Sequence, residues 1–136
     1  LILDLDHFKK VNDNYGHTTG DQVLQMFSEI IKSHTRDCDV AGRFGGEEFI
    51  IILPETDLEG AHTFAERIRK SLEQAHIAKE DEKIKVTVSI GAAVYQDKHG
   101  TNPLLLLEDA DTALYQAKEQ GRNQTVSWTQ QDSKIT

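Results

Sequence analysis

The segment 43–49 constrains the fold most, because it joins a tight turn to two adjacent carboxylates. Gly45 and Gly46 follow an Arg-Phe pair and precede Glu47, Glu48 and the apolar run Phe-Ile-Ile-Ile-Leu. Apolar residues on both sides of a glycine pair predict a β-hairpin with acids at its tip. Like charges at one tip repel, so we expect a cation there. Oxygen ligands without a neighbouring thiolate or imidazole favour magnesium.

The composition indicates one soluble globular domain. The chain has 136 residues, of which 38% are hydrophobic and 28% are charged, and this suffices for a single core. No window approaches the roughly 18 apolar residues of a membrane span, so we expect no membrane contact. The net charge of −8 argues against a nucleic acid polymer as a partner, whereas a nucleotide bridged by a metal ion stays compatible with it.

Two further features concern the cellular environment of the chain and the protein to which it belongs. The single Cys38 excludes an internal disulfide and suits a reducing, cytoplasmic environment. The chain starts abruptly at Leu1 without an initiator Met, so we expect it to be the interior of a longer protein.

Hydrophobic periodicity predicts a succession of strands and helices. Strands are expected at 1–5, 40–44, 48–53, 84–95 and 125–128, and helices at 8–15, from about 21, at 58–75 and at 104–120. Gly121 is expected to end the last helix, and the polar residues 129–136 to form a frayed tail. This order predicts an α+β fold, an α/β sandwich in which helices cover a mixed sheet.

Four acids form the first candidate cluster, namely Asp4, Asp6, Glu47 and Glu48. Asp4 and Asp6 lie two positions apart at the end of a strand, so they share one face. On their own they are equally typical of a turn or a helix cap. Together with the hairpin acids they resemble the carboxylates that hold two magnesium ions in phosphoryl-transfer enzymes. Adjacent strand residues point to opposite faces, so only one hairpin acid can meet Asp4 squarely, and we favour Glu47 in the turn.

The stretch that follows the first strand suggests a nucleotide site. The junction before the helix at Phe8 leaves backbone N–H groups unpaired, which suits phosphate, and Lys9 adds a positive charge. Asn12 and Asp21 are candidate base readers, because a carboxylate can accept from guanine N1–H and N2–H₂ together. The alternative is a polar loop in which Asp21 caps the next helix.

Two cationic features each have an ordinary alternative. Lys118 and Arg122 lie at the end of the last helix, where cations are favourable by about 0.3–1 kcal/mol whatever the function. Arg36 and Asp39 have the chemistry to clasp a guanine from two edges, Arg at O6 and N7 and Asp at the N1 and N2 side. They equally form an exposed ion pair, worth about 0–1 kcal/mol.

Taken together, these segments resemble the GGDEF family, the diguanylate cyclases. The resemblance rests on five segments in the family's order: Asp-Leu-Asp-His-Phe-Lys-Lys-Val-Asn-Asp at 4–13, Tyr-Gly-His-Thr-Thr-Gly-Asp at 15–21, Arg-Phe-Gly-Gly-Glu-Glu-Phe at 43–49, Val-Ser-Ile-Gly at 88–91 and Ala-Asp-Thr-Ala-Leu-Tyr-Gln-Ala-Lys-Glu-Gln-Gly-Arg-Asn at 110–123. It covers residues 1–128, which would form the catalytic domain. It implies a five-stranded sheet with surrounding helices, related to the palm of nucleotidyl cyclases and polymerases.

The resemblance also implies a reaction and a site. Family members condense two GTP into cyclic di-GMP and two pyrophosphates. Two Mg²⁺ per active site, or Mn²⁺ in their place, would be held by Asp4, the Leu5 carbonyl, Glu47 and Glu48. Glu47 would also take the proton from the attacking 3′-hydroxyl. The phosphates would be held by His7, Phe8, Lys9, Lys118 and Arg122, and guanine would be read by Asn12 and Asp21.

Regulation follows from the same resemblance. Arg36 and Asp39 match the family's RxxD inhibitory site for cyclic di-GMP, with Arg67 as a second arginine. Activity would need a homodimer, usually arranged by an upstream sensory or receiver domain of a cytoplasmic or membrane-anchored parent protein. The chain lacks the helix with a Leu-Thr-x-Leu-x-Asn-Arg type segment that normally precedes the first strand. The alternative function is a catalytically weak domain that senses cyclic di-GMP or GTP.

Overall fold

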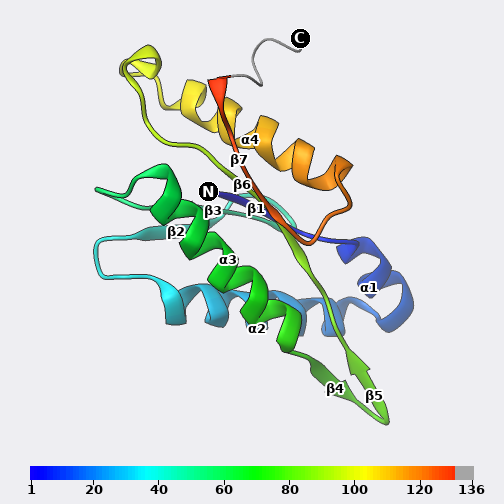
Figure 1. Ribbon diagram of the computed structural model, residues 1–136. Coiled ribbons are helices and arrows are strands. Elements are labelled where there is room, and N and C mark those ends of the chain that lie inside the picture. The colour runs from blue at the N-terminus through cyan, green and yellow to red at the C-terminus, as the bar shows by residue number, and fades with distance from the viewer. Residues whose placement is uncertain (131–136) are drawn as a thin grey trace.

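The protein folds into a mixed sheet with helices on both faces (Figure 1). The computed structural model describes residues 1–130. The elements, in chain order, are β1 (Ile2–Leu5), α1 (Phe8–Tyr15), α2 (His17–His34), β2 (Val40–Arg43), β3 (Glu48–Ile52), α3 (Leu58–Gln74), β4 (Ile77–Lys79), β5 (Glu82–Ile84), β6 (Val88–Ala92), the 3₁₀ turn η1 (Asp97–His99), α4 (Pro103–Glu119) and β7 (Thr125–Ser127).

The main sheet has the strand order β2-β3-β1-β6-β7. Neighbouring strands are antiparallel, except for β6 and β7, which are parallel. The predicted α+β sandwich around a mixed five-stranded sheet is therefore confirmed. None of the helices within residues 1–130 combines the length and the apolar character needed to cross a lipid bilayer.

The two faces of the sheet have different neighbours, because side chains alternate along β1. Leu3 and Leu5 are buried in the larger core, together with Phe27 of α2 and Ile68 of α3. Ile2 points to the opposite face and packs against buried residues of α4. Figure 1 shows the same division, with α4 on one side of the sheet and α2 and α3 on the other. A polar residue of β1 on the α4 face must therefore find its partners under that helix.

Helix α4 lies unusually close to the centre of the sheet, at Gly91 of β6. A Cβ added to Gly91 would lie 2.1 Å from the carbonyl oxygen of Ala110 and 2.4 Å from the backbone nitrogen of Leu114. Both atoms belong to the helix backbone, so a flexible side chain cannot relieve the overlap. The absence of a side chain at this position therefore sets the distance between β6 and α4.

The predicted start of the second helix, near residue 21, is wrong. Helix α2 begins at His17, directly after Gly16, and its first turn closes with a 3.1 Å bond from the Gly20 N–H to the Gly16 carbonyl. Gly16 has φ of 88°, a left-handed conformation that suits glycine. Asp21 is thus an exposed residue inside α2 and does not cap it.

The predicted strand over 84–95, with an interruption at Gly91, is also wrong, because β6 runs through Gly91. Strand β6 covers only its middle, and β5 pairs with β4 in a separate two-stranded hairpin. Lys79 and Glu82 are partners, so Glu80 and Asp81 form a two-residue turn, with Glu80 at φ of 54°. Such turns favour Asn-Gly, Asp-Gly or Gly-Gly, and this one is Glu-Asp without a glycine, so the sequence lacks the usual turn signal.

The other predicted elements are confirmed within a few residues at each end. Helix α4 ends at Glu119, and Gly121 follows its C-cap with φ of 117°, as predicted for the residue that stops the helix. The Arg122 N–H donates to the Ala117 carbonyl at 2.9 Å, and the Gly121 N–H to the Lys118 carbonyl at 3.4 Å, which is the Schellman pattern. Of the predicted tail, residues 131–136 lie outside the described residues.

The connection between β6 and α4 is held by a buried histidine. His99 is 2% exposed, its Nε2 lies 2.7 Å from Asp109 Oδ2, and its Nδ1 accepts from the Gln96 N–H at 2.8 Å. Because Nδ1 accepts, Nε2 carries the hydrogen and donates to Asp109. Lys98 adds a 3.0 Å ion pair to Asp109 and lies 3.6 Å from the centre of the Trp128 ring. This cluster fixes the N-terminal half of α4 to the end of the sheet.

We predict that Gly91→Ala lowers the free energy of unfolding by about 1–3 kcal/mol, because the new methyl group must push α4 off β6. The matched control is Gly42→Ala in β2, where an added Cβ has no atom within 4 Å. Urea denaturation measures both. Equal stability of the two variants would contradict the close packing at Gly91.

Candidate active site

The site is built on two carboxylates that face each other across neighbouring strands. Asp4 of β1 pairs in register with Glu48 of β3, so both side chains lie on the α4 face of the sheet. Asp4 is 7% exposed, and its Oδ2 lies 2.6 Å from the Nζ of Lys118, in the last turn of α4. The structure thus places Lys118, predicted to hold phosphate, on the carboxylate predicted to hold metal.

The acids repel each other in this arrangement. Burial raises the pKa of Glu48 above its ordinary value, and the charge of Asp4 raises it further, while the Lys118 ammonium lowers it. The nearby Asp111 and Glu47 raise this pKa as well, and a cation near Glu48 would relieve the repulsion among these acids. The cation expected at the hairpin tip stays a prediction.

The hairpin turn is held in place by Arg43, which the sequence reasoning did not assign to the site. Its guanidinium donates to the Gly45 and Gly46 carbonyls at 2.6–3.0 Å. The Leu5 N–H donates to the Glu47 carbonyl at 3.2 Å, so the tip is also tied to β1. Glu47 therefore lies beside the end of β1, but the choice of Glu47 as the acid that meets Asp4 is wrong. Strand β3 already begins at Glu48, so the residue paired in register with Asp4 is Glu48. The signal for Arg43 is its position directly before the turn, from which a long donor can reach the turn carbonyls.

Asp6 does not belong to this cluster, although the sequence analysis grouped it there. Its carboxylate accepts from Ser89 Oγ at 2.6 Å, Thr87 Oγ1 at 2.7 Å and the Asn123 N–H at 3.0 Å. With three donors and only 4% exposure, Asp6 joins the end of β1 to β6 and to the loop after α4. Its role is structural.

The donor set suits a hard divalent cation, because the nearby ligands are carboxylate and carbonyl oxygens. Within residues 1–130 no three His, Cys, Asp or Glu side chains converge as a ready metal site. The side chains that fit the cation are Asp4 and Glu48, with Glu47 at the adjacent tip and the Leu5 carbonyl at the strand end. Coordination would require Asp4 to exchange the Lys118 ammonium for the metal.

A pocket of about 460 Å³ opens between the hairpin and the first two helices. It brings together five of the predicted site residues, namely Phe8, Lys9, Asn12, Asp21 and Glu47. Its other lining residues are His17, Leu24, Arg43 and Gly46. Its volume suits a nucleotide base with part of its ribose or phosphates.

Asn12 takes its place in this pocket because residue 20 has no side chain. A Cβ added to Gly20 would lie 1.9 Å from Asn12 Oδ1. The sequence analysis did not single out Gly20, although a glycine inside a helical pattern is a signal of close packing.

The junction between β1 and α1 has the backbone shape that the phosphate prediction requires. His7 precedes the helix in a left-handed conformation, with φ of 55°, and its side chain does not cap the helix. The first N–H groups of α1, from Phe8 and Lys9, have no partner within the helix. The His7 side chain itself lines a different pocket, together with Lys10.

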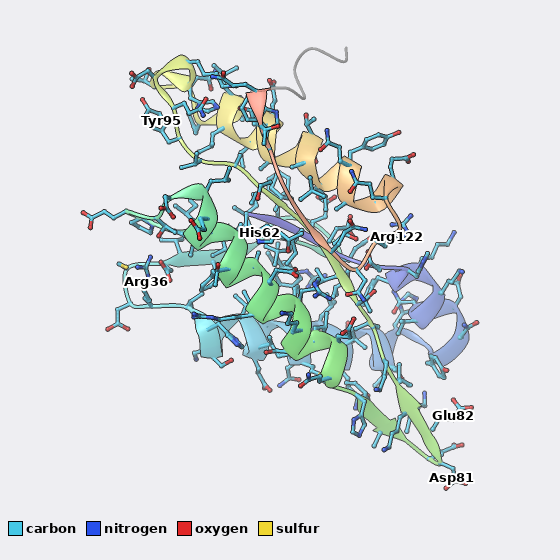
Figure 2. The ribbon with its side chains drawn as sticks, in the orientation of Figure 1. Arg36, His62, Asp81, Glu82, Tyr95 and Arg122 are labelled. Atoms are coloured by element: carbon cyan, nitrogen blue, oxygen red, sulfur yellow. The ribbon has the colours of Figure 1, made fainter. Side chains whose placement is uncertain are left out.

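The remaining predicted phosphate ligand, Arg122, follows α4. It has φ of 66°, and its carbonyl accepts from Gln124 Nε2 at 3.0 Å. Figure 2 labels it in the loop after that helix. The pocket lining does not include Arg122, so its role stays a prediction.

Arg36, labelled in Figure 2, forms an ion pair with Asp39. Arg36 donates to Asp39 Oδ1 at 2.8 Å and also to the Pro54 carbonyl and Thr56 Oγ1. The hydrogen bond from Arg36 lowers the pKa of Asp39 below its usual range. Arg67 lines a separate pocket along α3, so the structure does not bring the three predicted inhibitory residues into one set of contacts.

Comparison with known proteins identifies the class. The family model described as "Diguanylate cyclase, GGDEF domain" matches residues 1–124. The chain therefore belongs to the GGDEF domain family, and the resemblance based on the five segments is confirmed.

Among curated relatives, diguanylate cyclase A of Treponema denticola is 48% identical over 127 residues, which are 93% of this chain and 34% of that protein. Response regulator PleD of Caulobacter vibrioides is 43% identical over 128 residues, which are 93% of this chain and 28% of that protein. The chain thus spans about a third of the length of these relatives.

Two solved structures share the fold closely. The GGDEF domain of DgcB from Caulobacter crescentus, in complex with c-di-GMP, has a TM-score of 0.87 and 36% identity, and the match covers 93% of this chain and 74% of that one. The active GGEEF domain of a diguanylate cyclase from Vibrio cholerae has a TM-score of 0.86 and 33% identity, with 95% and 81% covered.

We predict that Glu48→Gln removes most of the stabilisation that Mg²⁺ gives to the folded protein. A cation that binds only the folded state at about ten times its dissociation constant adds about 1.4 kcal/mol. Thermal unfolding with and without Mg²⁺ measures this, with Glu82→Gln at the exposed tip of β4–β5 as control. An undiminished Mg²⁺ effect in Glu48→Gln would exclude that carboxylate from the site.

The same measurement has a pH dependence. Because the pKa of Glu48 is raised in the folded protein, its ionised form lowers stability at neutral pH in the absence of metal. That loss disappears as the pH falls through the raised pKa. Without metal, Glu48→Gln should therefore unfold at a slightly higher temperature than the parent at neutral pH. With metal, the Mg²⁺ effect should fade on acidification at a pH above the ordinary pKa of a glutamate.

Proposed function

We propose that this chain is the catalytic domain of a diguanylate cyclase that condenses two GTP into cyclic di-GMP and two pyrophosphates. The observation that carries the proposal is the pocket in which Lys9, Asn12, Asp21 and Glu47 meet, next to the Asp4–Glu48 pair. Membership of the GGDEF family supports it independently. GTP as substrate assigns the reaction to the cytoplasm.

In this proposal, a divalent cation is held by Asp4, the Leu5 carbonyl, Glu47 and Glu48. We expect Mg²⁺, two ions per active site, with Mn²⁺ able to replace it. When bound, the metal neutralises phosphate charge and makes the 3′-hydroxyl a better nucleophile. Lys118 would then leave Asp4 for the phosphates, and Asp4 would exchange a monovalent ammonium for a divalent ion.

Substrate recognition divides between two parts of the pocket. The N–H groups at the start of α1 and the side chains of Lys9 and Arg122 bind the phosphates, because a helix start and cations both attract anions. Asp21 accepts from the N1–H and N2–H₂ of guanine, and Asn12 binds a further edge of the base. Adenine offers no such pair of donors, so the domain is expected to prefer GTP to ATP.

The reaction needs two copies of the domain. The 3′-oxygen of one GTP forms a bond to the α-phosphorus of the other, the bond to the β-phosphate oxygen breaks, and pyrophosphate leaves with that electron pair. Glu47 takes the proton from the 3′-hydroxyl. One domain binds one GTP, so a homodimer completes the site, and an upstream sensory or receiver domain would act by raising the effective concentration of one half-site near the other.

We predict that Glu47→Gln abolishes turnover and leaves the fold intact, because Glu47 lies in an exposed turn and its loss removes a ligand and a base together. The assay uses GTP and Mg²⁺ with the protein stripped of nucleotide and dimerised by a fused coiled coil. Products are separated by chromatography, with Asp4→Asn as the blank.

Product that appears only with both acids intact would support the cyclase. Turnover in Glu47→Gln at the parent rate would remove that residue from the site. A folded dimer that binds GTP and forms no product would instead favour the alternative function, a weak cyclase that senses GTP or cyclic di-GMP.

We also propose that Arg36, Asp39 and Arg67 bind the product and restrain the enzyme. The likeness to a domain solved in complex with c-di-GMP supports this, as does the exposure of Arg36. For product to bind, Arg36 would have to release its bonds to Asp39, Pro54 and Thr56.

We predict that Arg36→Ala relieves inhibition by cyclic di-GMP without lowering the initial rate. The fold should tolerate it, because an exposed ion pair contributes about 0–1 kcal/mol. Initial rates at increasing product concentration measure the effect, with Lys32→Ala on the exposed face of α2 as control. Inhibition equal to that of the parent would make the match to the inhibitory motif accidental.

A further inference from the structure

The β4–β5 hairpin makes a specific bridge to the first two helices. It projects from one end of the molecule, with Asp81 and Glu82 at its tip (Figures 1 and 2). Lys79, the last residue of β4, donates from its Nζ to the Tyr15 carbonyl at 2.8 Å and to Thr19 Oγ1 at 3.0 Å. These partners lie 64 and 60 positions earlier in the chain. One ammonium group thus joins the hairpin to two successive helices.

The two acceptors stand on opposite sides of a sharp bend. Tyr15 is the last residue of α1, where carbonyls lack partners within the helix and a cation is favourable. Thr19 lies in the first turn of α2 and is 2% exposed. Only Gly16 separates the two helices, and it has a left-handed φ. Glycine has no side chain, so no contact from the bend itself can fix the angle between the helices. Lys79 therefore supplies the brace from another part of the chain.

This bend joins the two residues proposed to read guanine. Asn12 lies one turn before the end of α1, and Asp21 lies two positions after Thr19. The Asn12 side chain also packs directly against Gly20, the neighbour of Thr19. A change in the angle between α1 and α2 therefore moves Asn12 relative to Asp21. Lys79 is absent from the pocket lining, so any effect on the base must pass through Tyr15 and Thr19.

We infer that Lys79 is a positioning residue for guanine recognition, acting by fixing the angle between α1 and α2. The inference rests on the proposed roles of Asn12 and Asp21. The β4–β5 hairpin has no part in the proposed metal, phosphate or inhibitory sites, and this inference gives it a role in the recognition of guanine.

The test compares Lys79→Met, which keeps the aliphatic stem and removes the ammonium, with Lys79→Arg, which keeps a cation. The control is Lys83→Met on β5 of the same hairpin, where Lys83 pairs in register with Ala78. No hydrogen bond or ion pair of the Lys83 side chain is found within residues 1–130. Steady-state rates are measured with GTP and with ITP, which lacks the 2-amino group.

In Lys79→Met we expect the KM for GTP to rise about fivefold, the loss that accompanies a displaced hydrogen bond, with kcat changed less than about twofold. The preference for GTP over ITP should fall by a similar factor, while the Mg²⁺ midpoint stays unchanged. Lys79→Arg should recover most of both effects. Lys83→Met should match the parent.

Two outcomes would overturn the inference. The first is an unchanged KM and GTP preference in Lys79→Met, and the second is a loss of thermal stability with kcat and KM both unaltered at the assay temperature. The proposed guanine readers are checked separately with Asn12→Ala and Asp21→Ala. If these leave the GTP preference intact, the proposed recognition fails, whatever Lys79 does.

Discussion

The ion pair between Asp4 and Lys118 is the contact on which the rest of this structure depends. A carboxylate that is 7% exposed at the centre of a sheet requires a donor, and the donor comes from the last turn of α4 at 2.6 Å. For Lys118 to reach it, α4 must lie across the middle of the sheet. Gly91 permits that approach, the His99–Asp109 pair holds the first half of the helix, and the glycine cap at its end directs the chain back into β7.

The same arrangement explains why the site is both stable and reactive. Asp4 and Glu48 oppose each other on neighbouring strands, which is unfavourable for like charges. The Lys118 ammonium offsets part of that repulsion, but the pKa of Glu48 stays above its ordinary value. A divalent cation would offset more of it. The opposed carboxylates therefore explain both the repulsion without metal and the expected affinity for a metal. The fold tolerates this because β1 and β3 are fixed by the apolar core on their other face.

The fold was largely predictable from the sequence, since alternation along strands, helical spacing and the glycine at 121 are local signals. Two local features were not. Helix α2 starts at His17 because Gly16 turns the chain and because Thr19 finds a partner in Lys79, a contact that spans 60 positions. The β4–β5 hairpin turns on Glu80 and Asp81 without a glycine, so the segment between the predicted helix 58–75 and the predicted strand 84–95 gave no hairpin signal. Arg43 and Gly20 were missed because each acts through another residue. Arg43 donates to the turn carbonyls, and Gly20 leaves space for the Asn12 side chain.

Asp4 and Asp6 show why a carboxylate's role cannot be read from spacing alone. They share one face of the chain, two positions apart, and both are buried. Asp6 receives three donors, from residues 81, 83 and 117 positions away, which satisfy most of its acceptor sites without any cation. Asp4 receives one ammonium, from 114 positions away, and a cation can replace it. The number and charge of distant donors therefore separate a structural acid from a candidate metal ligand, and only the folded chain contains that information.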